Sequence, residues 1–437
     1  MGRRESRLRL PPILKNILTV SAGVVFGQAL SLLAMPVLSR FFSAESFGVL
    51  GTFLSIASIL GSLATLQYGA ALMLPKRDTE AANIFLLGCL SVAVVTGIVF
   101  IISVVLKGFG LAILKLPGNA YFLILLPLYV LFNGTNQMLI GWSVRRRQFR
   151  QNSASQVVRS LTVNSVQIAT APVFPSGGML AVGAMLGEFG SCINLGYGIW
   201  KNEKRFFRRC FSISWMKHFA KSYYDFPAFS TPQNFLNAVS QGLPILLLGH
   251  FYGIEVAGLY AFGIRLIQAP MGLLLTPLRQ VLFQKFCEVQ NHGVGIMPLY
   301  RKSTLGLLAV IILPVTIGIV FFPALFALVF GEGWRKAGEY ACWLLMWHAV
   351  GFCNVPSVLM ARILRMQRHM LLFDVATVSS RAILLVIGGL YWSDRQSVAA
   401  IGMLGALLNL FLITWIWKRV KHEEPSALHL PEKVKFA

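Results

Sequence analysis

The chain has 437 residues, of which 56% are hydrophobic and only 13% are charged. Soluble domains carry roughly 25% charged residues, so this composition excludes an ordinary soluble domain and indicates a membrane protein. The formal net charge of +23 would suit nucleic acid, but the basic residues collect in every second connection between apolar runs, as the positive-inside rule expects.

Apolar runs that can cross a bilayer follow one another along the chain. A span needs about 20 mostly apolar residues, and about twelve segments meet that requirement. The predicted spans are 13–39, 49–74, 83–106, 121–141, 156–174, 178–200, 223–249, 257–282, 304–328, 338–361, 371–392 and 398–417. The sequence therefore predicts an all-α polytopic membrane protein with about twelve transmembrane helices.

The charge distribution predicts the orientation. Arginine and lysine are dense at 3–15, 145–150 and 201–221, whereas the alternate connections hold few of them. We therefore expect a multi-pass membrane protein with both termini in the cytoplasm. The first span, 13–39, is too long for a signal-peptide core and no small-x-small cleavage site follows it, so we expect it to be retained.

The sequence carries no signature of an enzyme or a metal site. The six cysteines include no C-x-x-C pair, and most lie in or beside apolar spans, where cysteine behaves as a small hydrophobe. H-E-x-x-H, G-x-S-x-G and P-loop motifs are absent, and the short outer connections leave no room for a catalytic domain. We predict a protein that is not an enzyme and that uses no metal or cofactor.

A short polar corner occurs twice. RFFSAESFG at 40–48 is matched by HFYGIEVAG at 250–258, in the same place after the first span of each half. The corner residues are Arg40, Glu45 and Gly48 in the first copy and Glu255 and Gly258 in the second. A weaker match joins RRQFR at 146–150 to RMQRH at 365–369. Chance recurrence is the alternative, but the shared position favours two parallel six-helix halves around a central cavity.

The repeat predicts the domain organisation. We expect an N-terminal six-helix bundle over 1–200, a linker over 201–222, a C-terminal six-helix bundle over 223–418 and a cytoplasmic tail over 419–437. The linker mixes basic residues with aromatic ones, which is typical of an amphipathic helix on the inner leaflet.

Ionisable residues inside the spans are the candidate functional residues. Each costs at least a few kcal/mol in hydrocarbon and usually faces a bundle interior or an aqueous cavity. The basic ones are all arginines: Arg159, Arg265, Arg279 and Arg381. The others are Glu188, Asp225, Asp374 and His348.

Arginine presents a fixed fork of donors that grips phosphate oxygens, so the four arginines favour a phosphate-bearing ligand. The carboxylates either couple transport to protons or balance the arginines. Buried ion pairs between helices, such as Glu188 with an arginine, are the alternative. His348 is most simply a hydrogen-bonded core histidine, with a proton-sensitive role as the alternative.

Two patterns concern the helices themselves. Prolines are dense in the seventh and eighth predicted spans, where they either break helices that line a cavity or are simply tolerated. These prolines are Pro227, Pro232, Pro244, Pro270 and Pro277. Gly183, Gly187 and Gly190 place small residues at helical spacing, which predicts that the sixth span packs closely on a neighbour and brings Glu188 near that face.

Residues 13–84 resemble the opening of bacterial polysaccharide-export flippases of the Wzx type, within the superfamily that also holds multidrug exporters and the lipid II flippase. The matching features are the corner at 36–48, the inner loop LPKRDTEAAN at 74–83, RRRQF at 145–149 and GLYAFGIRLIQAP at 258–270. Related flippases often carry a charged triplet late in the second span, whereas this chain has Gln67, Tyr68 and Gly69, so no charge role is assigned there.

The resemblance implies translocation of an undecaprenyl-diphosphate-linked oligosaccharide from the inner to the outer leaflet of a bacterial plasma (inner) membrane by alternating access, for O-antigen, capsule or exopolysaccharide. It implies membrane lipids, and polysaccharide polymerase and glycosyltransferases, as candidate partners. Two alternatives stay open: a cation-coupled multidrug exporter of the same superfamily, which the absence of acids at 13–39 disfavours, and a non-transporting membrane scaffold or enzyme of glycan assembly.

Overall fold

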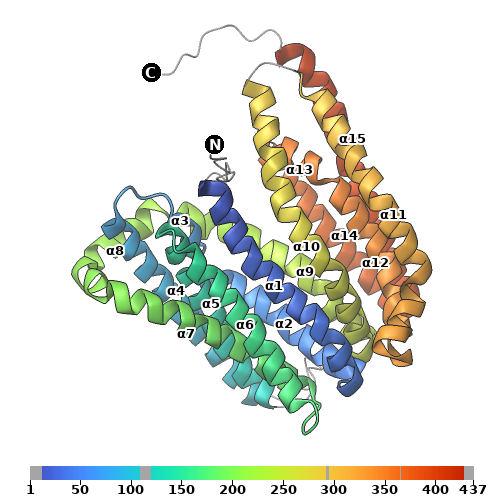
Figure 1. The fold of residues 1–437 in the computed structure, drawn as a ribbon, viewed down its shortest axis with the longest axis horizontal. Coiled ribbons are helices and arrows are strands. Elements are labelled where there is room, and N and C mark those ends of the chain that lie inside the picture. The colour runs from blue at the N-terminus through green and yellow to red at the C-terminus, as the bar shows by residue number, and fades with distance from the viewer. Residues whose placement is uncertain (1–11, 109–119, 292–294, 365, 428–437) are drawn as a thin grey trace, which may run out of the picture. The chain divides into compact units, whose positions relative to one another are not determined.

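The computed structural model describes residues 12–108, 120–291, 295–364 and 366–427, and every regular element in these ranges is a helix (Figure 1). Arg365 and the part of the predicted tail after residue 427 lie outside the described residues. The first half contains α1 (Pro12–Phe41), α2 (Ala44–Ala64), α3 (Tyr68–Ala71), α4 (Asp78–Gly108), α5 (Ala120–Arg145), α6 (Phe149–Thr170), α7 (Gly177–Cys210) and α8 (Ile213–Ser222). The second half contains the π-helix η2 (Phe226–Ser230), α9 (Thr231–Tyr252), α10 (Ile254–Asn291), α11 (Met297–Phe330), the 3-10 helix η3 (Glu332–Trp334), α12 (Arg335–Cys353), α13 (Val355–Ile363), α14 (Gln367–Tyr391) and α15 (Asp394–Ala427).

The membrane-helix prediction is confirmed. Ten segments of the described residues are helical, long and apolar enough to cross a membrane. α6 and α9, each 22 residues long, are also long enough to span but are more polar. Within α6, Asn152, Asn164 and Gln167 are buried, so these three polar side chains lie inside the protein. The chain is a multi-pass membrane protein.

The chain forms two compact units. The N-terminal unit contains Met1–Phe42 and Phe53–Ala238, and the C-terminal unit contains Ser43–Thr52 and Val239–Ala437. The first turns of α2 therefore belong to the C-terminal unit, and the first turns of α9 belong to the N-terminal unit. The expected boundaries at 200, 222 and 418 stay a prediction.

In the N-terminal unit, α6 packs against both α1 and α7 (Figure 1). A Cβ atom on Gly183 would lie 2.7 Å from Cγ of Gln167, and one on Gly187 would lie 2.2 Å from Cγ2 of Val163. Gly190 likewise faces α6. The predicted close packing of the sixth span is confirmed, and its neighbour is the polar helix α6.

The predicted linker forms two different structures. Residues up to Cys210 continue α7, and a separate helix, α8, begins at Ile213. Phe219 of α8 is buried, whereas Trp215 is 53% exposed, so the helix has one apolar side in the protein and one outside it. Its place on the inner leaflet stays a prediction.

In the C-terminal unit, α12 packs against α10, α11 and α15. α9 continues through Pro244, and α10 continues through Pro270 and Pro277, so these prolines do not break their helices. The irregular backbone lies earlier, in η2, which contains Pro227. Packed neighbouring helices allow a membrane helix to continue through proline.

Candidate functional site

A buried carboxylate lies at the centre of a polar cluster in the N-terminal unit. Glu188 of α7 is 0% exposed. Its Oε2 accepts a hydrogen bond of 2.9 Å from Nδ2 of Asn136, and its Oε1 accepts bonds of 3.2 Å from Nδ2 of Asn133 and 3.5 Å from the hydroxyl of Tyr129. The three donors come from α5, one helical turn apart, so a single helix face satisfies the carboxylate.

Arg159 of α6 completes this cluster. Its Nη2 lies 2.5 Å from Oε1 of Glu188, so the pair is an ion pair between α6 and α7. The arginine side chain is 39% exposed, which leaves part of it outside the packed core. The arginines and carboxylates are expected either to serve transport or to form ion pairs between helices. Arg159 and Glu188 have the geometry of such an ion pair. The backbones of α6 and α7 approach closely beside this ion pair, because Arg159 O lies 3.1 Å from where a Gly187 Cβ would be.

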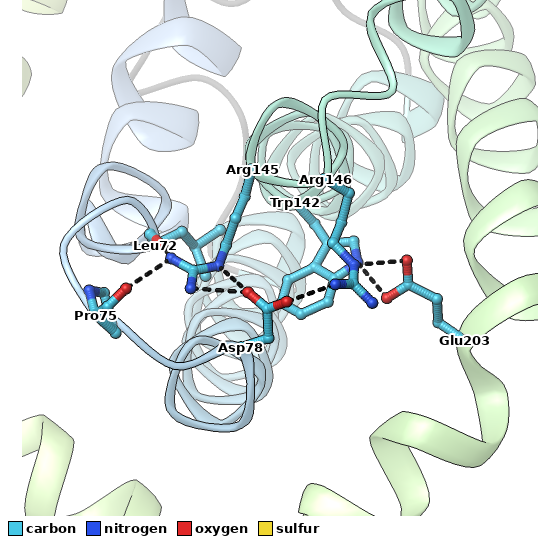
Figure 2. A network of polar contacts seen from close by, with 7 residues as sticks. All are labelled: Leu72, Pro75, Asp78, Trp142, Arg145, Arg146 and Glu203. Carbon is cyan, nitrogen blue, oxygen red and sulfur yellow. Dashed lines mark hydrogen bonds and ion pairs between the residues drawn. The ribbon is translucent and has the colours of Figure 1, made fainter.

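A second charged network joins α4 and α5 at the end of the N-terminal unit that is predicted to be cytoplasmic (Figure 2). Asp78 accepts hydrogen bonds from Nε and Nη2 of Arg145, at 3.1 and 2.9 Å, and from Nη1 of Arg146 at 2.6 Å. Arg145 also donates to the carbonyl oxygens of Leu72 and Pro75. The two inner-loop motifs at 74–83 and 145–149 are therefore joined by their own side chains.

Glu203 extends this network to α7. It accepts a hydrogen bond of 2.9 Å from Nε of Arg146 and one of 3.0 Å from the indole nitrogen of Trp142 (Figure 2). The hydrogen bond to Glu203 raises the pKa of Arg146 above its ordinary value. The guanidinium also lies over the rings of Trp142 and Phe206, at 5.6 and 5.4 Å. The start of α4, the end of α5 and the C-terminal part of α7 are thus held together by charge-assisted bonds and aromatic packing.

The C-terminal unit holds a buried arginine with a different environment. Arg381 of α14 is only 7% exposed. Its Nη1 donates a hydrogen bond of 3.2 Å to Oγ of Ser240, and its guanidinium carbon lies 4.1 Å from the ring centroid of Trp347. Within the described residues Arg381 has no carboxylate at ion-pair distance, and its Nε has no hydrogen-bond partner.

His348 lies beside Trp347 on α12. Its Nδ1 is 2.9 Å from the carbonyl oxygen of Leu344, and its Nε2 is 3.4 Å from Nε2 of Gln268. The environment is that of a hydrogen-bonded helix histidine within electrostatic range of Arg381. A proton-sensitive role stays a prediction.

The two repeated corners contact each other. A Cβ on Gly48 would lie 1.9 Å from the carbonyl oxygen of Ile254, and one on Gly258 would lie 1.8 Å from that of Ala44. Each glycine therefore meets the backbone at the start of the other helix, within the C-terminal unit. Phe47 enters an aromatic cluster there, with ring centroids 5.1 Å from Phe262 and 5.3 Å from Trp334.

The remaining candidates lie apart from these clusters. Arg265 is partly buried on α10 and has contacts of its own. The exposed candidates are Arg279, Asp225, Asp374, Arg40, Glu45 and Glu255. Asp374 lies within electrostatic range of Arg381, two turns away on the same helix. Roles for these residues stay predictions.

The sequence interpretation missed several residues that the structure assembles. Asn133 and Asn136 lie on one helix face in an otherwise apolar span, a spacing that points to a buried polar partner. Asp78 and Glu203 are acidic residues in segments that are otherwise basic. Their opposite charge is the one sequence feature that indicates ion pairing. Trp347 carries no sequence signal that distinguishes it from other membrane tryptophans.

Comparison with known proteins identifies the family. A family described as polysaccharide biosynthesis proteins matches residues 37–339. The chain belongs to this family. The teichuronic acid biosynthesis protein TuaB of Bacillus subtilis (strain 168), a similar protein, is 26% identical over 118 residues. That match covers 27% of this chain and 24% of the relative's length.

Solved structures show that this polysaccharide biosynthesis protein has the fold of the MOP transporter superfamily. An inward-facing multidrug resistance MATE family transporter of that superfamily aligns with a TM-score of 0.70 at 12% identity, covering 94% of this chain and 99% of the transporter. The lipid II flippase MurJ, in an inward closed conformation, aligns with a TM-score of 0.69 at 12% identity, covering 94% and 91%. A MOP superfamily transporter from Pyrococcus furiosus aligns at 0.61 with 14% identity, covering 95% and 97%. The predicted fold is confirmed.

Proposed function

We propose that this protein moves an undecaprenyl-diphosphate-linked oligosaccharide from the inner to the outer leaflet of a bacterial plasma membrane by alternating access. The family and the transporter fold support a flippase of surface polysaccharide synthesis. Under this proposal both termini are cytoplasmic, and Arg381 binds the diphosphate while the lipid tail stays in the bilayer.

Arg381 is the observation that carries the proposal. A buried cation is costly unless it is paired, yet Arg381 is buried with a neutral hydroxyl and an indole ring as its described partners. Such a group gains most from an anionic substrate, because a phosphate supplies the missing charge and acceptors. Arg265 and Arg279 are proposed to assist by attracting the same diphosphate.

The Glu188–Arg159 pair has a second role in the proposal. Arg159 is expected to share in substrate binding, and its ion pair with Glu188 supports the alternative role of balancing that carboxylate. The pair also bears on the alternative of a cation-coupled drug exporter. Such an exporter needs an acid free to attract cations, and the buried Glu188 is neutralised by Arg159, which favours the anionic substrate.

Flipping in proteoliposomes tests the proposal. Purified protein is reconstituted with a labelled undecaprenyl-diphosphate oligosaccharide, and an impermeant reagent modifies only the glycan that reaches the outside. We expect protein-dependent exposure and a loss of about tenfold or more in rate for Arg381→Gln, because a charge-assisted hydrogen bond is worth about 1.5–3 kcal/mol.

Arg368→Gln is the matched control, because Arg368 is an exposed arginine on the same helix. It should flip the substrate at the wild-type rate. Wild-type protein that exposes no glycan, in liposomes where an established flippase is active, would contradict the proposed function. Full activity of Arg381→Gln would remove Arg381 from the substrate site.

A further inference from the structure

The buried polar groups of the C-terminal unit that have no hydrogen-bond partner in the described residues include the Tyr260 hydroxyl and Nε of Arg381. Tyr260 of α10 is 1% exposed, and its hydroxyl oxygen has no hydrogen-bond partner within the described residues. The same holds for Nε of Arg381. The two groups are within electrostatic range of each other. A buried donor without an acceptor costs about 1–3 kcal/mol, so two such donors together require an explanation.

The Arg381 side chain is also held in one orientation. Its guanidinium lies over Trp347, and the indole of Trp347 has Gly405 of α15 on its ring, where a Cβ would lie 2.5 Å from Cγ. The ring therefore cannot move toward α15. Together with the hydrogen bond to Ser240, this fixes the plane of the guanidinium and the direction in which Nε–H points.

We propose that Arg381 and Tyr260 both donate to phosphate-type oxygens of one anion, and that Trp347, supported by Gly405, is the positioning residue that holds Arg381 for it. This inference rests on the proposed function, because it assigns the groups that bind the substrate's anionic part. The site offers two directional donors, Nε–H of Arg381 and the Tyr260 hydroxyl. The charge of the Arg381 guanidinium lies over the aromatic face of Trp347. The site favours an anion, since Nε of Arg381 and the Tyr260 hydroxyl can both donate and neither has a described acceptor.

Neighbouring groups support this polarity. Asp374 is exposed and makes no ion pair with Arg381 in the described residues, so it leaves the guanidinium unneutralised. Ser240 uses its oxygen to accept from Nη1. The acceptor for Nε must therefore come from elsewhere.

Binding measurements with a soluble probe test the inference. The probe is geranylgeranyl diphosphate, added to purified protein in nanodiscs of neutral lipid. Tyr260→Phe removes only the hydroxyl, and we expect affinity to fall about three- to tenfold. Trp347→Leu should lower affinity about tenfold, because it removes a desolvated cation–π contact, whereas Trp347→Phe should restore most of it.

Trp343→Leu is the matched control. Trp343 lies one turn earlier on α12 and also adjoins a glycine of α15, since a Cβ on Gly402 would lie 2.6 Å from the carbonyl oxygen of Trp343. No described guanidinium lies over its ring. It should bind the probe with wild-type affinity. Unchanged affinity in both Tyr260→Phe and Trp347→Leu would overturn the inference, as would equal losses in Trp343→Leu, Trp347→Phe and Trp347→Leu.

Competition identifies the source of the anion. Inorganic diphosphate and phosphatidylglycerol are each added against the probe. If the prenyl diphosphate binds at least tenfold more tightly than both, the site belongs to the lipid-linked substrate. Equal competition by phosphatidylglycerol supports the site but assigns its anion to a bilayer headgroup. Wild-type protein that binds the probe yet flips no lipid-linked glycan would contradict the proposed function while leaving this site standing.

Discussion

Glu188 shows how a single charge is accommodated in a membrane helix. Its two oxygens accept from side-chain donors of α5 and pair with Arg159 of α6. Asn136 is itself held, because its Oδ1 accepts a 3.0 Å bond from the hydroxyl of Ser191. Networks of this kind are stable only while every member is satisfied.

Replacing the carboxylate should therefore be costly. Glu188→Gln keeps the shape but turns amide donors toward Asn133 and Asn136 and leaves Arg159 without its counter-charge. We expect the free energy of unfolding to fall by about 1–3 kcal/mol, measured as a lower Tm in detergent. The double variant with Arg159→Gln should lose less than the sum of the two single changes, as interacting residues do.

Glu332→Gln provides the control for this experiment. Glu332 also pairs with an arginine, Arg335, but its side chain is 74% exposed, and exposed pairs contribute little. Its Tm should stay at the wild-type value. A Glu188→Gln protein with wild-type Tm, or a strictly additive double variant, would show that the cluster contributes no coupling energy.

At this scale the sequence predicts which residues matter better than it predicts their partners. Hydrocarbon penalises any charge, so Glu188, Arg159 and Arg381 can be found by scanning the spans. Their neighbours are neutral and far away in sequence: Asn136 is 52 residues from Glu188 and Ser240 is 141 from Arg381. Neutral polar residues carry a smaller penalty in a span, and hence a weaker signal.

At the scale of elements, the repeated corner acquires a physical reason. α2 and α10 begin where Gly48 and Gly258 each face the backbone of the other helix. A side chain at either position requires the helices to separate, since the clashing atoms belong to backbone. The sequence match predicts a repeat, but the contact between its two copies depends on tertiary packing, which no local pattern encodes.

Gly48→Ala and Gly258→Ala should each destabilise the protein by about 1–3 kcal/mol, because overpacking forces backbone shifts. Thermal unfolding of the purified variants measures this effect. Gly306→Ala is the control, since a Cβ there meets no atom within 4 Å in the same unit, and alanine has the higher helix propensity. Corner variants as stable as Gly306→Ala would contradict the described contact.

Helix boundaries follow the sequence closely, and the departures have identifiable causes. The second predicted span divides into α2 and α3 where Leu66 and Gln67 adopt positive φ values of 45° and 59°. Neither residue is a glycine, so composition gives no warning of the turn. α3 contacts η2, so the short helix that follows the turn at Leu66 and Gln67 lies beside the π-helical turn of the N-terminal unit. π-helical turns are frequent at functional sites.

At the scale of the whole molecule, the apolar runs predict the helices and the charge pattern predicts their orientation. The ten apolar helices of the described residues, together with α6 and α9, match the predicted number of about twelve spans. The network of Arg145 and Arg146 shows that some basic residues serve folding as well, because two acids bind them directly. If the predicted orientation holds, exposed basic residues such as Lys217 on α8 face the inner leaflet, where each is worth about 1 kcal/mol against anionic lipid.

The topology predicts which residues an impermeant reagent can reach. With the six native cysteines replaced, a cysteine at exposed Gly333 in η3 should react with an impermeant maleimide on intact cells, because the predicted topology places η3, which follows the ninth span, on the outer side. A cysteine at Lys217 should react only after permeabilisation. Both positions are exposed in the structure, so a difference in labelling reports the side of the membrane and not burial. The reverse pattern would invert the predicted orientation, and with it the direction of proposed transport, because a lipid-linked glycan made in the cytoplasm must enter from the side that Lys217 occupies.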